Sequence, residues 1–371
     1  MKLNELFTGI SRLDVTSLIS GRKNKLVGLD IGSSSIKLMR IEDVNGKASV
    51  REYKDCPLER GVISEGLIAD LGKLVESLKG LVKEARCQGM GAVISLSGQS
   101  VIIKKTAFRE MGDEELRNTI LDEANKYFPF DNMEEVSFDF QVLGQNNYNP
   151  NLIDVVIVAA KKDVVDSYTE AVQLAGLKPA IVDVDSFALE TMYERNYEYT
   201  ENDIAVLINI GAGTTNINVV KNATSVFTRD FSLGGNSITE ALQSQYGLSF
   251  EEAERQKLFG PGDSCDKEVF ARDLLGFADP IILEIERSID YFRSTYEGHE
   301  DIKEVILSGG GALLKGLAEE VADRLRINTT LANPFQNVEV NRKLTIAEEL
   351  RTMAPRLAVV TGLALRRVGD K

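Results

Sequence analysis

Short apolar runs that end in glycine and small polar residues mark the strands that the chain predicts. The run LVGLDI at residues 26–31 leads into GSSS and resumes as the strand IKLMR. A second run, AVLINI at residues 205–210, leads into GAGTT and resumes as NINVV. Each pattern predicts a strand, a tight turn and a return strand. The chain therefore contains an internal repeat, with one hairpin opening each of two halves.

Apolar spacing elsewhere predicts helices and a separate module. Leucines at helical spacing predict a helix over residues 67–86. Strand and helix patterns between residues 92 and 182 read as an inserted module, with 144–151 as its clearest turn. Residues 1–24 form an N-terminal extension with an apolar stripe at Leu3, Leu6, Phe7, Ile10 and Leu13. This stripe favours a helix packed on its own protein over a contact with a partner or a membrane.

The predicted domain organisation follows from these elements. Residues 25–91 and 183–203 are expected to form the first half, and residues 92–182 the inserted subdomain that binds a partner. Residues 204–371 are expected to form the second half. A C-terminal helix at 353–368 is expected to pack back on the core.

Composition narrows the class of protein. Hydrophobic residues make up 43% and charged residues 27% of the 371 residues, which is typical of a globular protein. The net charge of -14 argues against a nonspecific grip on nucleic acid, which needs a basic face. The cysteines Cys56, Cys87 and Cys265 read as reduced thiols rather than disulfides, with a reactive thiol as the less favoured alternative. Because no signal peptide or membrane span is evident, we expect a cytoplasmic protein.

The turns carry the candidate chemistry. Small residues let a ligand approach the backbone closely, and successive amide and hydroxyl donors form a concavity that suits phosphate oxygens. A third cluster, Ser308-Gly309-Gly310-Gly311, lies between an apolar strand and a helix. It suits a phosphate or a flat base, or else it is an ordinary strand-to-helix turn. Neither a Walker loop nor a dinucleotide fingerprint is present. Two facing hairpins would form a phosphate clamp.

These motifs resemble the actin-like ATPase superfamily, in the branch that contains the FtsA cell-division and PilM pilus-assembly proteins. The resemblance covers nearly the whole chain. LDIGSSSIK is similar to the first phosphate loop, INIGAGTTN to the second and LSGGGALLKGL to the adenosine loop. SLGGNSITEAL, AERQK and the closing APRLAVVTGLALRR are also similar to this branch. The resemblance implies an α/β, actin-like (ribonuclease H-like) two-domain fold with a nucleotide cleft between related halves and an FtsA-type inserted subdomain.

The resemblance also implies ATP and Mg²⁺ as cofactors. Asp30 matches a position linked to magnesium, and Lys37 matches a position that contacts the phosphates. Glu254 and Lys257 match positions that hold ribose and base, although their spacing alone would indicate a solvated helix pair. The full set of implied nucleotide contacts is Asp30, Gly32, Ser33, Ser34, Ser35, Lys37, Gly211, Ala212, Gly213, Thr214, Gly235, Asn236, Glu254, Lys257, Gly309, Gly310 and Gly311.

One position departs from the family pattern. Asn209 stands where most relatives carry an aspartate, and an amide lacks the charge that helps hold magnesium and orient an attacking water. We therefore expect ATP binding with slow or absent hydrolysis. The catalytic candidates are Asp30, Asn209 and Asp185. Asp185 is also the second candidate metal ligand, with a helix N-terminal carboxylate as an equal alternative.

A nucleotide-gated adaptor of the type IV pilus assembly machine is favoured over an ATP-hydrolysing motor or filament. A sugar kinase would need a substrate motif that we do not find. The implied partner is the N-terminal cytoplasmic tail of the inner-membrane protein PilN, so that the chain links the PilN/PilO complex to the cytoplasmic motor. Motor ATPases, the platform protein and further copies in a ring are additional implied partners, and membrane association is expected through partners alone. The alternative is an FtsA-like protein that tethers a cytoskeletal polymer to the membrane, but the ending GLALRRVGDK lacks the appended membrane helix.

Overall fold

The computed structural model describes residues 26–370 except 124–125, 127, 129–132, 147–148, 262–265, 297, 299 and 342–345. The predicted N-terminal stripe at residues 3–13 and Cys265 therefore lie outside the described residues. Within the described residues, no helix has the length and apolar character needed to cross a membrane.

The first half is built on a six-stranded sheet in the order β10-β6-β1-β2-β3-β16. Its strands β1, β2 and β3 form an antiparallel meander, and β6 runs parallel to β1. Helices α2 and α5 pack on one face, whereas α6 and α13 pack on the other, so the strands are apolar on both faces. The strands are β1 (Leu26–Ile31), β2 (Ser35–Val44), β3 (Lys47–Pro57), β6 (Gly91–Leu96), β10 (Lys178–Val184) and β16 (Val338–Val340), and the helices are α2 (Leu71–Glu84), α5 (Lys162–Leu174), α6 (Asp185–Asn196) and α13 (Ala358–Leu365).

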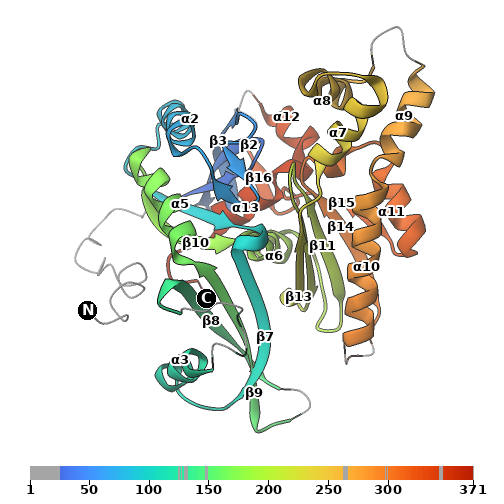
Figure 1. Cartoon of the computed structure of the whole chain (residues 1–371). Helices are drawn as coiled ribbons and strands as arrows, with labels where there is room; N and C mark the ends of the chain where they lie inside the picture. Colours follow the sequence, from blue (N-terminus) through green and yellow to red (C-terminus); the bar gives the residue numbers. More distant parts are fainter. Residues whose placement is uncertain are drawn as a thin grey trace.

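The second half repeats this design. Its sheet has the order β13-β12-β11-β14-β15, which matches β3-β2-β1-β6-β10 strand for strand. The repeat predicted from the two hairpins is therefore confirmed, and Figure 1 shows the two halves side by side. The strands are β11 (Ile204–Ile210), β12 (Thr215–Lys221), β13 (Thr224–Phe231), β14 (Ile302–Ser308) and β15 (Thr329–Leu331), and the helices are α7 (Gly235–Tyr246), α8 (Phe250–Phe259), α9 (Lys267–Gly276), α10 (Asp279–Thr295) and α11 (Leu317–Leu325).

A third sheet projects from the first half (Figure 1). It has the order β7-β9-β8, is antiparallel throughout and has its own apolar core with α3. Its elements are β7 (Val101–Arg109), α3 (Asp113–Asp122), β8 (Val136–Gln145) and β9 (Leu152–Lys161). By contrast, β6, α5 and β10 belong to the sheet and core of the first half. We therefore propose 101–161 as the inserted subdomain, narrower than the expected 92–182.

The C-terminal helix α13 lies on the first half although it follows the second half in sequence. It packs between β1 and α6 at very close range. A Cβ atom on Gly362 would stand 1.8 Å from the Ala188 carbonyl oxygen, and one on Gly28 would stand 2.5 Å from the Ala364 nitrogen. Glycine is thus required at both crossings. The remaining short elements are β4 (Ile63–Ser64), β5 (Leu67–Ile68), α12 (Ala347–Thr352) and the 3₁₀ turns η2 (Gly98–Ser100), η3 (Met133–Glu135), η4 (Gly311–Leu313) and η5 (Ala354–Leu357).

Candidate functional site

The two predicted turns have the same local geometry and face each other. The Gly32 amide donates to the Ser35 carbonyl at 3.1 Å, and the Gly211 amide donates to the Thr214 carbonyl at 2.9 Å. A Cβ atom on Gly213 would stand 3.4 Å from the Ser33 hydroxyl, so the tips of the turns approach closely. Two sets of turn amides and hydroxyls are thereby held on opposite sides of one gap, as a phosphate clamp requires.

Asp30 and Lys37 flank the first turn as direct cross-strand neighbours on β1 and β2. Lys37 Nζ lies 2.8 Å from Asp30 Oδ2, and the side chains are 13% and 14% exposed. The ammonium and carboxylate are thus positioned together at the turn. Of the serines expected to donate to phosphates, Ser34 is exposed and Ser35 is buried in β2.

The equivalent positions at the second turn are Asn209 and Asn216. The Asn209 side-chain amide donates to the Asn216 side-chain oxygen at 3.1 Å. Asn216 in turn stands opposite Asp230 on β13, and the Asp230 carboxylate accepts a hydrogen bond from the Gly98 amide at 2.8 Å. A row of polar groups therefore runs from the second turn to the base of the inserted subdomain. Asp230 was not among the site residues predicted from the sequence.

Asp185 is the first residue of α6 and lies close to Asp30. Its carboxylate accepts a hydrogen bond from the Ser95 hydroxyl at 2.5 Å. Desolvation and the negative charge of Asp30 raise the pKa of Asp185 to about 7. Two carboxylates that repel each other in this way fit a divalent cation, whose charge would reverse the effect. No group of three or more metal-ligating side chains occurs within the described chain. Mg²⁺ binds one or two carboxylates together with phosphates and water, so Asp30 and Asp185 are the candidates to hold it.

The second turn is fixed to the start of α7. The amides of Gly235 and Asn236 donate to the carbonyls of Gly211 and Ala212 at 2.9 and 2.7 Å. A Cβ atom on Gly234 would stand 2.6 Å from the Gly211 oxygen, so this glycine is required for the contact. Gly234 was not among the predicted site residues, although the SLGGNS stretch contains it.

Glu254 and Lys257 of α8 do not form a solvated pair. They form an ion pair at 2.6 Å, in which the Lys257 side chain is 12% exposed. Lys257 Nζ also donates to the Gly235 carbonyl at 2.9 Å and to the Thr239 hydroxyl at 2.7 Å. Burial lowers the pKa of Lys257. The pair therefore braces the first turn of α7, and Thr239 is a member that sequence analysis missed.

The three glycines after β14 differ in what surrounds them. Gly309 has a φ of 86°, and a Cβ atom there would stand 2.3 Å from the Ile210 oxygen. A Cβ atom on Gly311 would stand 2.3 Å from Ile210 Cγ2. Gly310 leaves more room, because the nearest atom to its Cβ position is Arg356 Cγ at 4.0 Å. Packing against β11 thus explains Gly309 and Gly311, whereas Gly310 leaves space for a ligand.

A contact between the halves lies beside the two turns. Arg60, just after β3, places Nη2 2.5 Å from Glu240 of α7. Its guanidinium also lies 4.1 Å from the centroid of the Phe250 ring at the start of α8. The two halves are therefore linked directly across the candidate site.

A family model described as "Type IV pilus assembly protein PilM" matches residues 28–368. The chain belongs to this family.

Two solved structures agree with the predicted fold, and one of them also agrees with the PilM family. A chain from a solved "PilM-PilN type IV pilus biogenesis complex" matches with a TM-score of 0.81 and 27% identity, covering 93% of this chain and 99% of that chain. The ethanolamine utilization protein EutJ from Carboxydothermus hydrogenoformans matches with a TM-score of 0.54 and 19% identity over 93% and 90% of the two chains, which supports the fold alone. The predicted actin-like α/β fold is confirmed.

FtsA proteins are more distant relatives. The cell division protein FtsA of Enterococcus hirae is 24% identical over 352 residues, covering 84% of this chain and 78% of that protein. FtsA of Bacillus subtilis is 23% identical over 352 residues, covering 83% and 78%. The predicted relationship to the FtsA branch is therefore confirmed, while the family model assigns the chain to PilM.

A cavity of about 250 Å³ lies where this PilM-family chain joins its inserted subdomain to both halves. The cavity combines apolar side chains with polar groups near the two turns. Its lining includes Val101 and Ile103 of β7, Val184 and Asp185 at the start of α6, and Arg229 and Asp230 of β13.

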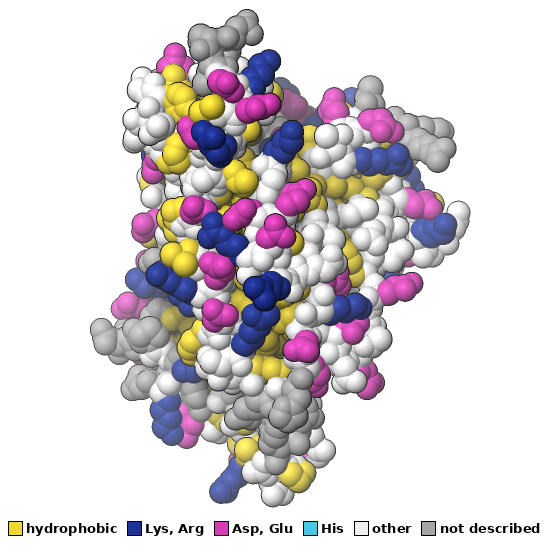
Figure 2. All heavy atoms as spheres, turned by 90° about the vertical axis from the view of Figure 1, so that its right-hand side faces the viewer, with side chains coloured by type: hydrophobic (Ala, Val, Ile, Leu, Met, Phe, Trp, Pro, Cys, Tyr) yellow, Lys and Arg dark blue, Asp and Glu magenta, His cyan; other side chains and the backbone are white. Residues whose placement is uncertain are grey.

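Two further features are the charges on one face of the molecule and the burial of the described cysteines Cys56 and Cys87. On the face that carries α9, α10 and α11, basic and acidic side chains alternate (Figure 2), and several are paired, such as Arg324 with Asp279 and Glu320. This face offers no basic patch for nucleic acid. Burial raises the pKa of the Cys56 and Cys87 thiols, which favours the protonated form over the reactive thiolate.

Proposed function

We propose that the chain is an ATP-binding, actin-like component of the type IV pilus assembly machine. It docks on the N-terminal cytoplasmic tail of the inner-membrane protein PilN and thereby links the PilN/PilO complex to the cytoplasmic motor. Membership of the PilM family and the likeness to a chain from a PilM–PilN complex support this proposal. The observation that supports nucleotide binding most strongly is the pair of facing turns, with Lys37 and Asp30 beside the first.

ATP would lie in the gap between the turns. The amides of both turns, the hydroxyls of Ser33 and Thr214, and Lys37 would bind its phosphates. Asp30 would hold Mg²⁺ through water, with Asp185 as the second carboxylate. Gly310, and the buried network of Glu254 and Lys257 around α7, would border the nucleoside.

Hydrolysis is expected to be slow. Asn209 is already engaged with Asn216, and its amide carries no charge with which to orient a metal-bound water. Nucleotide would then act mainly as a ligand that sets how the two halves sit.

The PilN tail would bind in the 250 Å³ cavity at the base of the inserted subdomain. An extended peptide can add to an exposed strand edge through main-chain hydrogen bonds and place apolar side chains in such a cavity. In the described chain, β7 pairs with β9 on one side only. The apolar side chains of Val101 and Ile103 on this strand line the cavity.

The same cavity provides a physical route for coupling. Asp185 is a candidate metal ligand, and Asp230 joins the second half to the insert through the Gly98 amide. A nucleotide that changes the separation of the halves would therefore change the cavity. If the peptide prefers one arrangement of the two halves, nucleotide binding changes the affinity for the peptide. Peptide binding must then change the affinity for the nucleotide by the same factor.

Binding of a fluorescein-labelled peptide with the N-terminal tail of PilN from the same organism tests this function. Fluorescence anisotropy should show saturable binding to the wild-type chain, and Ile103→Glu should weaken it at least about tenfold because a buried carboxylate lacks a partner. Val142→Glu is the matched control, because Val142 lies in the same subdomain at 40% exposure on β8. No binding to the wild-type chain, or equal loss in both variants, would refute this docking site.

A further inference from the structure

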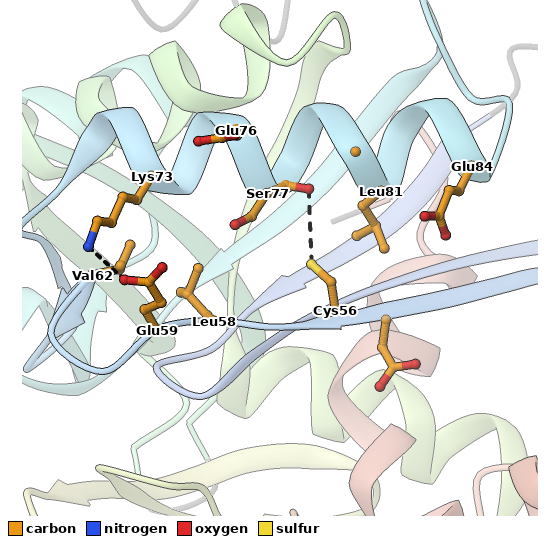
Figure 3. Close-up of a pocket in the computed structure, with 11 residues that line it drawn as sticks. Cys56, Leu58, Glu59, Val62, Lys73, Glu76, Ser77, Leu81 and Glu84 are labelled. Carbon is orange, nitrogen blue, oxygen red and sulfur yellow. Dashed lines mark hydrogen bonds and ion pairs between the residues drawn. The ribbon is translucent and has the colours of Figure 1, made fainter. Parts of the chain in front are cut away.

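A second groove lies on the far edge of the first half, away from the inserted subdomain. It has a volume of about 370 Å³ and runs between the end of β3 and helix α2. Figure 3 shows Cys56, Leu58 and Glu59 on the strand side facing Ser77 and Leu81 on the helix. Leu58, Val62 and Leu81 are buried and give the groove an apolar floor.

The strand side of the groove is an open sheet edge. In the six-stranded sheet, β16 pairs with β3 only from Ala48 to Val50. Beyond Val50, residues 51–57 of β3 have no strand partner on this side within the described residues. Such an edge offers main-chain donors and acceptors to an extended chain.

The helix side of the groove has a regular chemical pattern. Glu76, Gly80 and Glu84 all line it, and four-residue steps place them in one row along α2. Gly80 has no atom within 4 Å of its Cβ position, so the row has a gap between two carboxylates. Glu59 is neutralised by Lys73 at 2.6 Å, whereas neither Glu76 nor Glu84 has a basic partner among the described residues.

The spacing of this row matches an extended peptide. Glu76 and Glu84 are eight positions apart in the helix, which is about 12 Å along the axis. In a strand, residues i and i+4 lie on the same face about 13 Å apart, with residue i+2 between them. A strand added to β3 would therefore place two side chains of one face opposite the glutamates and the third opposite Gly80.

We propose that this groove binds an extended segment of a protein partner with the pattern cation-x-apolar-x-cation. The segment adds to the free edge of β3. Two Lys or Arg side chains pair with Glu76 and Glu84, and the apolar side chain enters the gap at Gly80 above Leu58 and Leu81. This surface is separate from the proposed PilN site, so either proposal can fail without the other.

The test uses the full chain and a fluorescein-labelled peptide, Thr-Lys-Thr-Leu-Thr-Lys-Thr, with Thr-Glu-Thr-Leu-Thr-Glu-Thr as its charge-inverted control. Anisotropy should show saturable binding of the lysine peptide, at least about tenfold tighter than the control. Glu76→Lys with Glu84→Lys should weaken binding at least about tenfold, because two surface attractions become repulsions. Glu114→Lys with Glu115→Lys on α3 changes the net charge equally and should change binding less than about twofold.

Gly80→Gln provides a variant that keeps the charges. Gly80 lies inside α2 with open space around it, so glutamine favours the helix and leaves the fold intact. The glutamine side chain should fill the gap and weaken binding of the lysine peptide at least about fivefold.

Three results would overturn the proposal. The first is equal binding of the two peptides, and the second is equal loss in the groove and α3 variants. The third is a dimer of the wild-type chain in sedimentation that Glu76→Lys with Glu84→Lys abolishes, because it would assign the groove to a second copy.

Discussion

Replacing Lys37 with alanine should weaken the binding of Mg²⁺ and ATP about 10- to 100-fold. Lys37 Nζ lies 2.8 Å from the Asp30 carboxylate, and both side chains are less than 15% exposed, at 13% and 14%. A charge-assisted hydrogen bond in such surroundings contributes about 1.5–3 kcal/mol, and each 1.4 kcal/mol is about a factor of ten in affinity. Removing the ammonium also leaves the Asp30 carboxylate facing the phosphates, and this repulsion adds to the loss.

Isothermal titration calorimetry with ATP in excess Mg²⁺ measures the effect. Lys47→Ala is the matched control, because Lys47 is also on a strand of the first sheet and also pairs with a carboxylate, Glu339 at 3.2 Å. Its side chain is 71% exposed, so its loss should change affinity less than about twofold. Thermal unfolding verifies that both variants are folded. Equal affinity of the two variants would refute the placement of Lys37 at the phosphates.

Three further predictions follow from single residues. Asn209→Asp should raise the rate of phosphate release from ATP without greatly changing ATP affinity, because a restored carboxylate acts mainly on the transition state; rapid hydrolysis by the wild-type chain would contradict this. Glu190 has a pKa raised by burial to about 8, from about 4.3 in an unfolded chain. Its neutral form therefore favours the fold at low pH, and this contribution is lost as pH rises towards and through about 8. Thermal unfolding should accordingly show Glu190→Gln gaining stability relative to wild type between pH 5 and pH 8.5, and a constant difference would refute the shift. Gly362→Ala should destabilise the chain by at least about 1–3 kcal/mol in denaturant unfolding, because its Cβ would clash with the Ala188 oxygen; an unchanged midpoint would contradict the tight helix crossing.

The sequence predicts the two turns well because their cause is local. Gly32 and Gly211 each close a four-residue turn, and the strands on either side have clear apolar runs. The same local patterns cannot define the inserted subdomain. Strands β6 and β10 look like β7 and β9 in sequence. The parallel pairing of β6 with β1, and of β10 with β6, places them in the first sheet.

Contacts between the halves are also beyond local reasoning. Asp230 meets the Gly98 amide across 132 residues of sequence, and Arg60 meets Glu240 across 180. Both contacts depend on how two separately formed sheets dock, which no periodicity encodes. The role of each glycine in a cluster also depends on contacts that are distant in sequence. Gly309 serves packing against Ile210, whereas its neighbour Gly310 leaves room for a ligand, and the sequence GGG does not distinguish them.

Hydrogen exchange of the wild-type chain, with and without Mg²⁺ and ATP, tests whether one nucleotide is held from both sides. The two sides are residues 30–37 of the first half and residues 209–216 of the second. We expect the amides of both turns to become protected together, at the same ATP concentration. Protection of one turn alone, or of neither, would contradict a nucleotide clamped between the two halves.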